Sequence, residues 1–202
     1  MKQFLSLIFL LICFFPFAQT DKELIEEIET YHASENKTFA SAETTILTKK
    51  DFKIFKELEF YPINLKYRVE ATFIRTPNET PFLMPTTTDR LPEYVKYGEA
   101  HFTLDGQKLK LNLYQNTQPY DEPGYEDYLF LPFTDLTSGD GSYGGGRFLD
   151  AKIPEGDTII LNFNKAYNPY CAYNARYSCP IPPKENNLSV RIEAGVKDFK
   201  KH

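Results

Sequence analysis

The chain has 202 residues, of which 42% are hydrophobic, and its formal net charge is -5 at pH 7. This length and hydrophobic content are sufficient for one domain around one core, and no internal repeat or low-complexity linker divides the sequence. Lys and Arg are scattered, and the acidic balance argues against nucleic acid or an anionic membrane as a partner, because both attract clustered cations.

The first 18 residues, MKQFLSLIFLLICFFPFA, have the pattern of a secretory signal peptide. Lys2 is a lone cation, a long apolar run follows, and the small residue Ala18 ends the segment. We expect removal of residues 1–18 and export of the mature chain, to the periplasm or out of the cell. The apolar run breaks at Pro16, whereas a membrane span needs about 20 apolar residues, so we expect no span after removal. Bulky residues precede Cys13, which disfavours lipidation there.

Two helix-start signals lie in residues 19–60, which we expect to form an N-terminal helical segment. Thr20 and Glu23 have the spacing of a capping box, and apolar residues then recur on one helical face, which predicts a helix over residues 21–39. Thr48, followed three residues later by an acid, repeats the signal. The second helix is expected to be short and to end at the Tyr-Pro pair that closes its apolar stripe.

Beyond this segment the hydrophobic pattern changes to a period of two. Residues 66–75, KYRVEATFIR, alternate polar and apolar side chains as a half-buried strand does. Residues 97–115 have the pattern of two strands joined by Asp105-Gly106, the strongest local signal for a hairpin. Further short strands, separated by turn residues, are expected at residues 127–133, 146–151, 157–163 and 188–194.

These elements predict a mainly β fold of the α+β class. Many short strands with hairpin connections and few helical crossovers favour an antiparallel sandwich or a barrel-like sheet. We expect the N-terminal helices to pack on one end or edge of this sheet. Residues 61–202 would then be a β-rich domain that forms a single globular unit with the helices.

A glycine-rich run, TSGDGSYGGGRFLDA, occupies residues 137–151. Its glycines allow sharp turns and exposed N–H groups, and Arg147 adds a forked cation that could hold a carboxylate or a phosphate. The alternative is structural: the glycines form a tight turn, and Arg147 pairs with Asp150 or with another acid in the sheet. The spacing is not that of a phosphate-binding loop, so the run alone is weak support for an anion site.

A second segment, NKAYNPYCAYNARYSCPIPPKENNL, occupies residues 164–188. Its amides and phenols offer directional hydrogen bonds and flat apolar faces, which suit a small polar ligand such as a sugar or a peptide segment. The same residue types also build turns. We expect the two segments to meet at a ligand-binding site. The candidate residues are Arg147, Asp150, Asn164, Asn168, Tyr173, Asn174, Glu185 and Asn186.

The sequence favours a binding module for a small polar or anionic ligand, and it leaves two alternatives open. An enzyme would use a thiolate at Cys171 or Cys179, or a carboxylate pair formed by Glu185 and Asp150. A structural protein would dock a partner through an exposed apolar patch. The spacings typical of metal and cofactor sites are absent, so we expect neither.

Cys171 and Cys179 are the cysteines that remain after removal of the signal peptide. In an oxidising compartment an isolated even pair is most simply a disulfide. The closed loop would be short, and it would restrict the unfolded chain by about 2 to 3 kcal/mol.

The segments YGGGRFLD, NPYCAYN and CPIPPKEN resemble the family catalogued as domain of unknown function 1684. The resemblance extends over most of the mature chain and includes KYRVEA and the hairpin. It implies a domain assignment. It implies no activity, cofactor or partner, because the family has no established activity.

Overall fold

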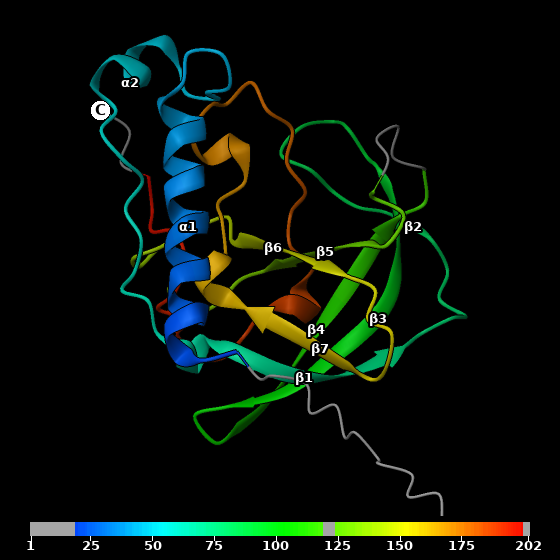
Figure 1. Ribbon diagram of the computed structural model, residues 1–202. Coiled ribbons are helices and arrows are strands. Elements are labelled where there is room, and N and C mark those ends of the chain that lie inside the picture. Colours follow the sequence, from blue (N-terminus) through cyan, green and yellow to red (C-terminus); the bar gives the residue numbers. More distant parts are fainter. Residues whose placement is uncertain (1–18, 119–123, 200–202) are drawn as a thin grey trace, which may run out of the picture.

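The computed structural model describes residues 19–118 and 124–199 (Figure 1). The predicted signal peptide, residues 1–18, lies outside the described residues. Within the described part, the α-helices are α1 (Asp21–Ala40) and α2 (Lys49–Ile54). The strands are β1 (Arg68–Arg75), β2 (Phe82–Leu83), β3 (Glu93–Leu104), β4 (Gln107–Asn116), β5 (Tyr128–Phe133), β6 (Arg147–Lys152) and β7 (Thr158–Asn162). Short 3-10 helices are η1 (Leu65–Tyr67), η2 (Phe163–Lys165), η3 (Tyr170–Ala172) and η4 (Lys184–Asn186).

The strands form one antiparallel sheet of seven, in the order β6-β5-β4-β3-β1-β7, and β2 pairs with β3. The sheet curls into a half-barrel, and its two edge strands, β6 and β7, approach each other without pairing (Figure 1). Helix α1 lies along one side of this sheet and contacts η2, which follows β7. The prediction of a mainly β, antiparallel, barrel-like fold with helices at an edge is confirmed.

Helix α1 begins where the capping box predicted. Glu23 N donates a hydrogen bond to Thr20 Oγ1, and Thr20 N donates one to Glu23 Oε2 at 2.8 Å, so two backbone donors of the first turn are satisfied. Ile28 is fully buried beneath the helix. His32 Nε2 forms a 2.7 Å hydrogen bond with the carbonyl oxygen of Asn164, which ties α1 to the chain after β7.

Helix α2 is shorter than expected, since it ends at Ile54. The prediction that its apolar stripe stays helical as far as the Tyr-Pro pair was wrong. The peptide groups that follow find other partners: Leu58 N donates to Asn36 Oδ1 of α1 at 2.6 Å, and Phe60 forms a bridge with Val196. These long-range hydrogen bonds satisfy the backbone in an extended conformation, and they have no signal in the local sequence.

The β3–β4 hairpin turns at Asp105-Gly106, as predicted. Both residues have positive φ, 50° and 76°, which is what a two-residue turn of the I′ type requires. Strand β3 begins earlier than expected and carries a bulge between Lys96 and Gly98. The bulge inverts the alternation of side chains, so Tyr94 packs on the opposite face of the sheet from the core residues beyond the bulge.

The two faces of the sheet carry different clusters. The inner face, defined by Leu111, Leu131 and Leu161, holds the main core, and all three side chains are fully buried. The outer face carries an aromatic cluster that includes Phe130 and Phe148. A third cluster lies between the two α-helices and the C-terminal segment. No helix among the described residues is long and apolar enough to cross a membrane.

The predicted strand at residues 188–194 was wrong. Burial alternates along this segment as expected, but the segment packs on the inner face outside the seven strands. Side chains bond to several of its peptide groups: Arg147 donates to the carbonyls of Ile192 and Ala194, and Ile192 N donates to Asp135 Oδ2 at 2.6 Å. Two backbone hydrogen bonds, from Leu188 N to the Thr134 carbonyl and from Leu136 N to the Val190 carbonyl, connect the segment to the loop after β5. An extended segment that packs on one face of a sheet shows the same alternation of buried and exposed residues as a strand within the sheet. The hydrophobic pattern alone therefore does not distinguish the two.

Candidate functional site

Arg147 is buried in the core and is not presented to a ligand. Its side chain is 0% exposed, as is that of Asp135, and Arg147 Nη2 lies 3.3 Å from Asp135 Oδ2. The same nitrogen donates to Thr137 Oγ1 at 3.2 Å. Burial lowers the pKa of Arg147, while the charge of Asp135 opposes this shift. Arg147 is therefore paired with an acid, which was the structural alternative given in the sequence analysis. The acid is Asp135 and not Asp150.

The predicted asparagines hold the backbone of the chain itself. The side-chain amides of Asn164, Asn168, Asn174 and Asn186 all donate to carbonyl oxygens of distant segments. Asn164 donates to the carbonyl of Asn64, and Asn168 donates to that of Lys197. Asn174 donates to the carbonyl of Ile46, and Asn186 donates to those of Asn112 and Pro132. The asparagine-rich segment is thus fastened to the rest of the fold by its own amide groups.

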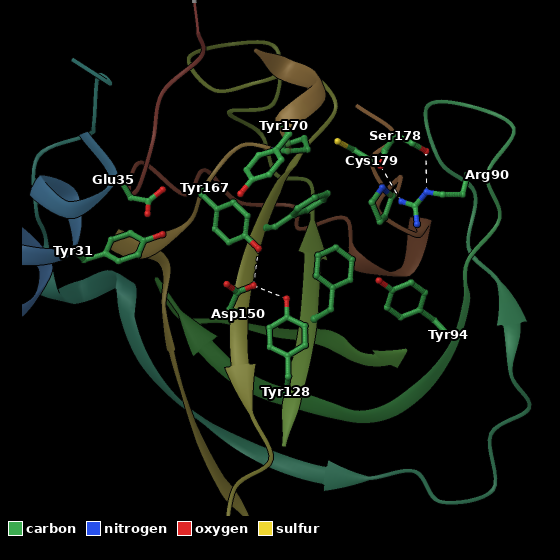
Figure 2. A pocket seen from close by; sticks show the side chains of 14 residues that line it. Tyr31, Glu35, Arg90, Tyr94, Tyr128, Asp150, Tyr167, Tyr170, Ser178 and Cys179 are labelled. Carbon is green, nitrogen blue, oxygen red and sulfur yellow. Dashed lines mark hydrogen bonds between the residues drawn. The ribbon is translucent and has the colours of Figure 1, made fainter. Parts of the chain in front are cut away.

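A cleft of about 410 Å³ lies on the outer face of the sheet, and we call it the main cleft (Figure 2). Residues 164–188, which we call the motif segment, and α1 contribute to its other walls. Its lining residues are Tyr31, Glu35, Arg90, Tyr94, Tyr128, Phe130, Phe148, Asp150, Tyr167, Pro169, Tyr170, Ser178, Cys179 and Pro180. Of the eight predicted ligand-binding residues, Asp150 lines this cleft and the others do not. The volume is within the range of small-molecule sites, about 300 to 1,000 Å³.

Strand alternation places the floor of the main cleft. Phe130 of β5 pairs with Asp150 of β6, so their side chains share one face, and Tyr128 and Phe148 lie two residues away on that same face. The residues between them, such as Leu149, belong to the main core on the inner face. The bulge in β3 adds Tyr94 to this side of the sheet.

The carboxylate of Asp150 is held in place by two phenols. Its Oδ1 accepts hydrogen bonds from Tyr128 at 2.7 Å and from Tyr167 at 2.6 Å (Figure 2). Burial raises the pKa of Tyr167 well above its ordinary value, and the negative charge of Asp150 raises it further. Tyr167 therefore keeps its proton and remains a donor to Asp150. Asp150 is itself exposed to the solvent of the cleft.

Glu35 supplies a second carboxyl group to the same cleft, from α1. Burial raises the pKa of Glu35, and the charge of Asp150 raises it further. Tyr31 lies one helical turn before Glu35 on the same face of α1, and burial, Glu35 and Asp150 in that order raise its pKa. Figure 2 shows the Tyr31 hydroxyl directed toward the side of the cleft that holds Asp150 and Tyr167. The cleft thus has one acidic end, formed by Glu35 and Asp150.

Arg90 lies at the opposite end of the main cleft (Figure 2). Its Nε donates to Ser178 Oγ at 3.2 Å and its Nη2 donates to the Ser178 carbonyl at 2.9 Å. Ser178 is in turn hydrogen-bonded to Thr88 and Thr86, at 2.6 and 2.9 Å. The guanidinium group is exposed, but these bonds fix its position.

A second cavity of about 320 Å³, which we call the edge cavity, adjoins the main cleft. It is lined by β6 and β7, the edges where the half-barrel does not close, and by α1. Tyr31, Asp150 and Tyr167 line both spaces. Lys165, which lines the edge cavity, forms an ion pair with Glu27 of α1.

Cys171 and Cys179 are free thiols in the structure, so the predicted disulfide is not formed there. Cys171 N donates a hydrogen bond to Cys179 Sγ at 3.1 Å. The hydrogen bond with the Cys179 thiol lowers the pKa of Cys171 to about 6 and raises that of Cys179, so the proton of the pair stays on Cys179. Cys179 is buried and lines the main cleft.

The described residues contain no group of three or more His, Cys, Asp and Glu side chains that could hold a metal ion. Glu185, the proposed partner of Asp150 in a carboxylate pair, is exposed and does not line the main cleft. Within that cleft the carboxyl group that accompanies Asp150 is Glu35.

Several lining residues had a sequence signal that the prediction did not use. Tyr167 and Tyr170 belong to the motif segment, where tyrosines were treated as a group and only Tyr173 was selected. Tyr31 and Glu35 have the i, i+4 spacing of one helix face, but nothing local shows that this face meets β6. The prediction therefore selected a segment that lines the main cleft, but, apart from Asp150, side chains that do not line it.

A family described as Protein of unknown function (DUF1684) has a model that matches residues 53–197. No curated protein matches the chain. Among solved structures, the solution NMR structure of an uncharacterised protein from Haloarcula marismortui is similar, with 28% sequence identity and a TM-score of 0.69, over 90% of this chain and 97% of that chain. The family match includes Asp150, Tyr128 and Tyr167, and it begins after Tyr31 and Glu35.

Proposed function

Since the chain belongs to the DUF1684 family, which is described only as of unknown function, we propose from the geometry of the main cleft that it is a binding module for a small polar ligand. The observation that carries this proposal is the Asp150 carboxylate, oriented by Tyr128 and Tyr167 on the floor of a cleft walled by aromatic rings. A few fixed polar groups among apolar walls are typical of sites that orient a small ligand.

The cleft supports a polar ligand better than an anionic one. The cation that the sequence suggested for anion binding, Arg147, is buried against Asp135, outside the cleft. The acidic end formed by Glu35 and Asp150 repels a carboxylate or a phosphate. An anionic group on the ligand is compatible only with the Arg90 end.

The proposal is tested by screening the mature chain, residues 19–202, against sugars, amino acids, amines and organic anions by thermal shift and calorimetry. We expect Asp150→Asn to weaken binding of any hit by about tenfold or more, because a hydrogen bond to a charged group contributes about 1.5 to 3 kcal/mol. Asp127→Asn is the matched control, since Asp127 pairs with Lys152 and does not line the cleft. Indifference to every class, or equal loss in both variants, contradicts the proposal.

We also propose that the protein is exported and that Cys171 and Cys179 form a disulfide in the exported form. The pattern of residues 1–18 supports export, and the 3.1 Å contact between Cys171 N and Cys179 Sγ supports pairing of two adjacent thiols. N-terminal sequencing of the protein from the source cell should begin at Gln19. Alkylation of both thiols without prior reduction would contradict the disulfide.

A further inference from the structure

We propose that the ligand of the main cleft is a small organic cation, whose ammonium group lies between the carboxyl groups of Asp150 and Glu35 and against the tyrosine rings. This inference rests on the proposed function and names the chemical class of its ligand. Three independent features of the cleft carry it: the hydrogen-bonding character of its acidic end, its charge, and its aromatic walls.

The two phenols that are bonded to Asp150 act as acceptors toward a ligand. Tyr128 and Tyr167 both direct their hydroxyl protons to Asp150 Oδ1, so each phenol offers only oxygen lone pairs to a ligand. A ligand that satisfies Asp150 and these two phenol oxygens has to donate hydrogen bonds.

Within the main cleft, no described cation lies at this acidic end. Among the described residues that line the main cleft, Arg90 is the one cation, and it lies at the opposite end, bonded to Ser178. The adjoining edge cavity is lined by two cations: Lys165, which pairs with Glu27, and Arg68, whose charge acts on the same Glu27. A ligand cation between Glu35 and Asp150 would relieve the repulsion between the two carboxylates, and a neutral or anionic ligand would not.

The walls of the cleft suit the organic part of such a cation. Tyrosine rings come from α1, β3, β5 and the motif segment, and Phe130 and Phe148 close the floor. The negative faces of aromatic rings attract ammonium groups within about 6 Å of the ring centre, and most strongly where water is excluded. Aromatic rings next to carboxylates are the combination that selects a cation with apolar substituents over a bare metal ion. The described residues accordingly provide no set of three metal ligands.

The test uses probes that differ in charge and not in shape. Choline is compared with its neutral carbon analogue, in which a tert-butyl group replaces the trimethylammonium group, and putrescine represents primary amines. Binding to the mature chain is measured by calorimetry and by ligand-observed NMR. We expect choline or putrescine to bind, and the neutral analogue to bind at least about tenfold more weakly than choline. Equal binding of choline and its neutral analogue would overturn the inference.

Variants locate the effect within the cleft. Asp150→Asn and Glu35→Gln should each weaken cation binding about tenfold, because each removes one negative charge from the acidic end. Asp127→Asn, which removes a negative charge outside the cleft, should leave the affinity for choline unchanged. Tyr128→Phe removes one of the two hydrogen bonds to Asp150 and keeps the aromatic ring. Thermal melts of all four variants verify folding. Cation binding that survives in both acid variants would also overturn the inference.

The outcomes separate this inference from the proposed function. If sugars or organic anions bind and Asp150→Asn abolishes their binding, while choline and putrescine do not bind, the binding module stands and the cation is wrong. If no class of probe binds, both proposals fail. Glycine betaine carries a carboxylate in addition to a trimethylammonium group. If Arg90→Ala weakens the binding of glycine betaine more than the binding of choline, Arg90 contacts the carboxylate of the ligand.

Discussion

At the scale of single residues, Arg147 shows how a motif residue that suggests a ligand is used by the fold itself. Its guanidinium group donates to the carbonyls of Ile192 and Ala194, while Asp135 accepts from Ile192 N. Together the two side chains satisfy peptide N–H and C=O groups that a neighbouring strand would satisfy in a sheet. The charges are buried, so each depends on the other for compensation.

We predict that Arg147→Ala lowers the free energy of unfolding by about 3 to 5 kcal/mol, because it leaves Asp135 buried without its partner. Urea denaturation measures the change. Arg191→Ala is the control: Arg191 forms an exposed ion pair with Asp140, and its loss should lower the free energy of unfolding much less than the loss of Arg147 does. A similar small loss in both variants would show that Arg147 is not part of the structural framework.

At the scale of elements, Asn186 takes the place of a missing peptide hydrogen bond between β4 and β5. Pro132 has no N–H to offer to β4. The Asn186 side chain donates to the carbonyls of Pro132 and Asn112, at 2.7 and 2.9 Å, and accepts from Asn112 N at 2.8 Å. The amide group of one residue, held by η4, thus joins two strands of the sheet.

Asn186→Ala should therefore destabilise the fold by about 3 kcal/mol, because it leaves buried peptide groups of Asn112 and Pro132 without partners. Hydrogen exchange should show faster exchange of the Asn112 amide. Asn187→Ala, next to it, removes an exposed contact with Thr134 and should change stability by about 1 kcal/mol or less. If the amide of Asn112 stays protected in Asn186→Ala, water replaces the side chain and the argument is wrong.

At the scale of the whole molecule, the acidic end of the main cleft joins a helix to an edge strand. Glu35 comes from α1 and Asp150 from β6, and they line the same cleft only because the half-barrel leaves this side open and α1 lies along it. The titratable groups that interact electrostatically with Glu35 are Asp150, Tyr31, Tyr170 and Tyr173. Stability and binding should therefore depend on pH through Glu35.

The sign of this dependence follows from the raised pKa of Glu35. The Glu35 carboxyl group binds its proton more tightly in the folded protein than in the unfolded chain. The protonated Glu35 therefore contributes stability below the ordinary pKa of 4.5, and this contribution is lost as pH rises through the pKa of the folded state. We predict that Glu35→Gln stabilises the protein at neutral pH and that this gain disappears at acid pH. Thermal melts across pH measure it, and a gain that is independent of pH would contradict the assignment.

The sequence by itself determined the elements that depend on local chemistry. The capping box set the start of α1, Asp105-Gly106 set the hairpin, and alternation located β1, β3 and β4. The short runs between turn residues located β5, β6 and β7. The motif segments also determined the family. These signals are readable because the residues that form them are neighbours along the chain.

Only the tertiary structure decided which buried segment joins the sheet and which side chains share a cavity. Residues 188–194 alternate as a strand does, but their hydrogen-bond partners, which include the side chains of Arg147 and Asp135, lie far away in the sequence and do not form a neighbouring strand of the sheet. Asp150 was predicted, whereas Glu35 meets it through the placement of α1 beside an open sheet edge. Long-range packing selects among arrangements that local patterns leave equivalent, and this is the physical reason that the cleft had to be seen in the structure.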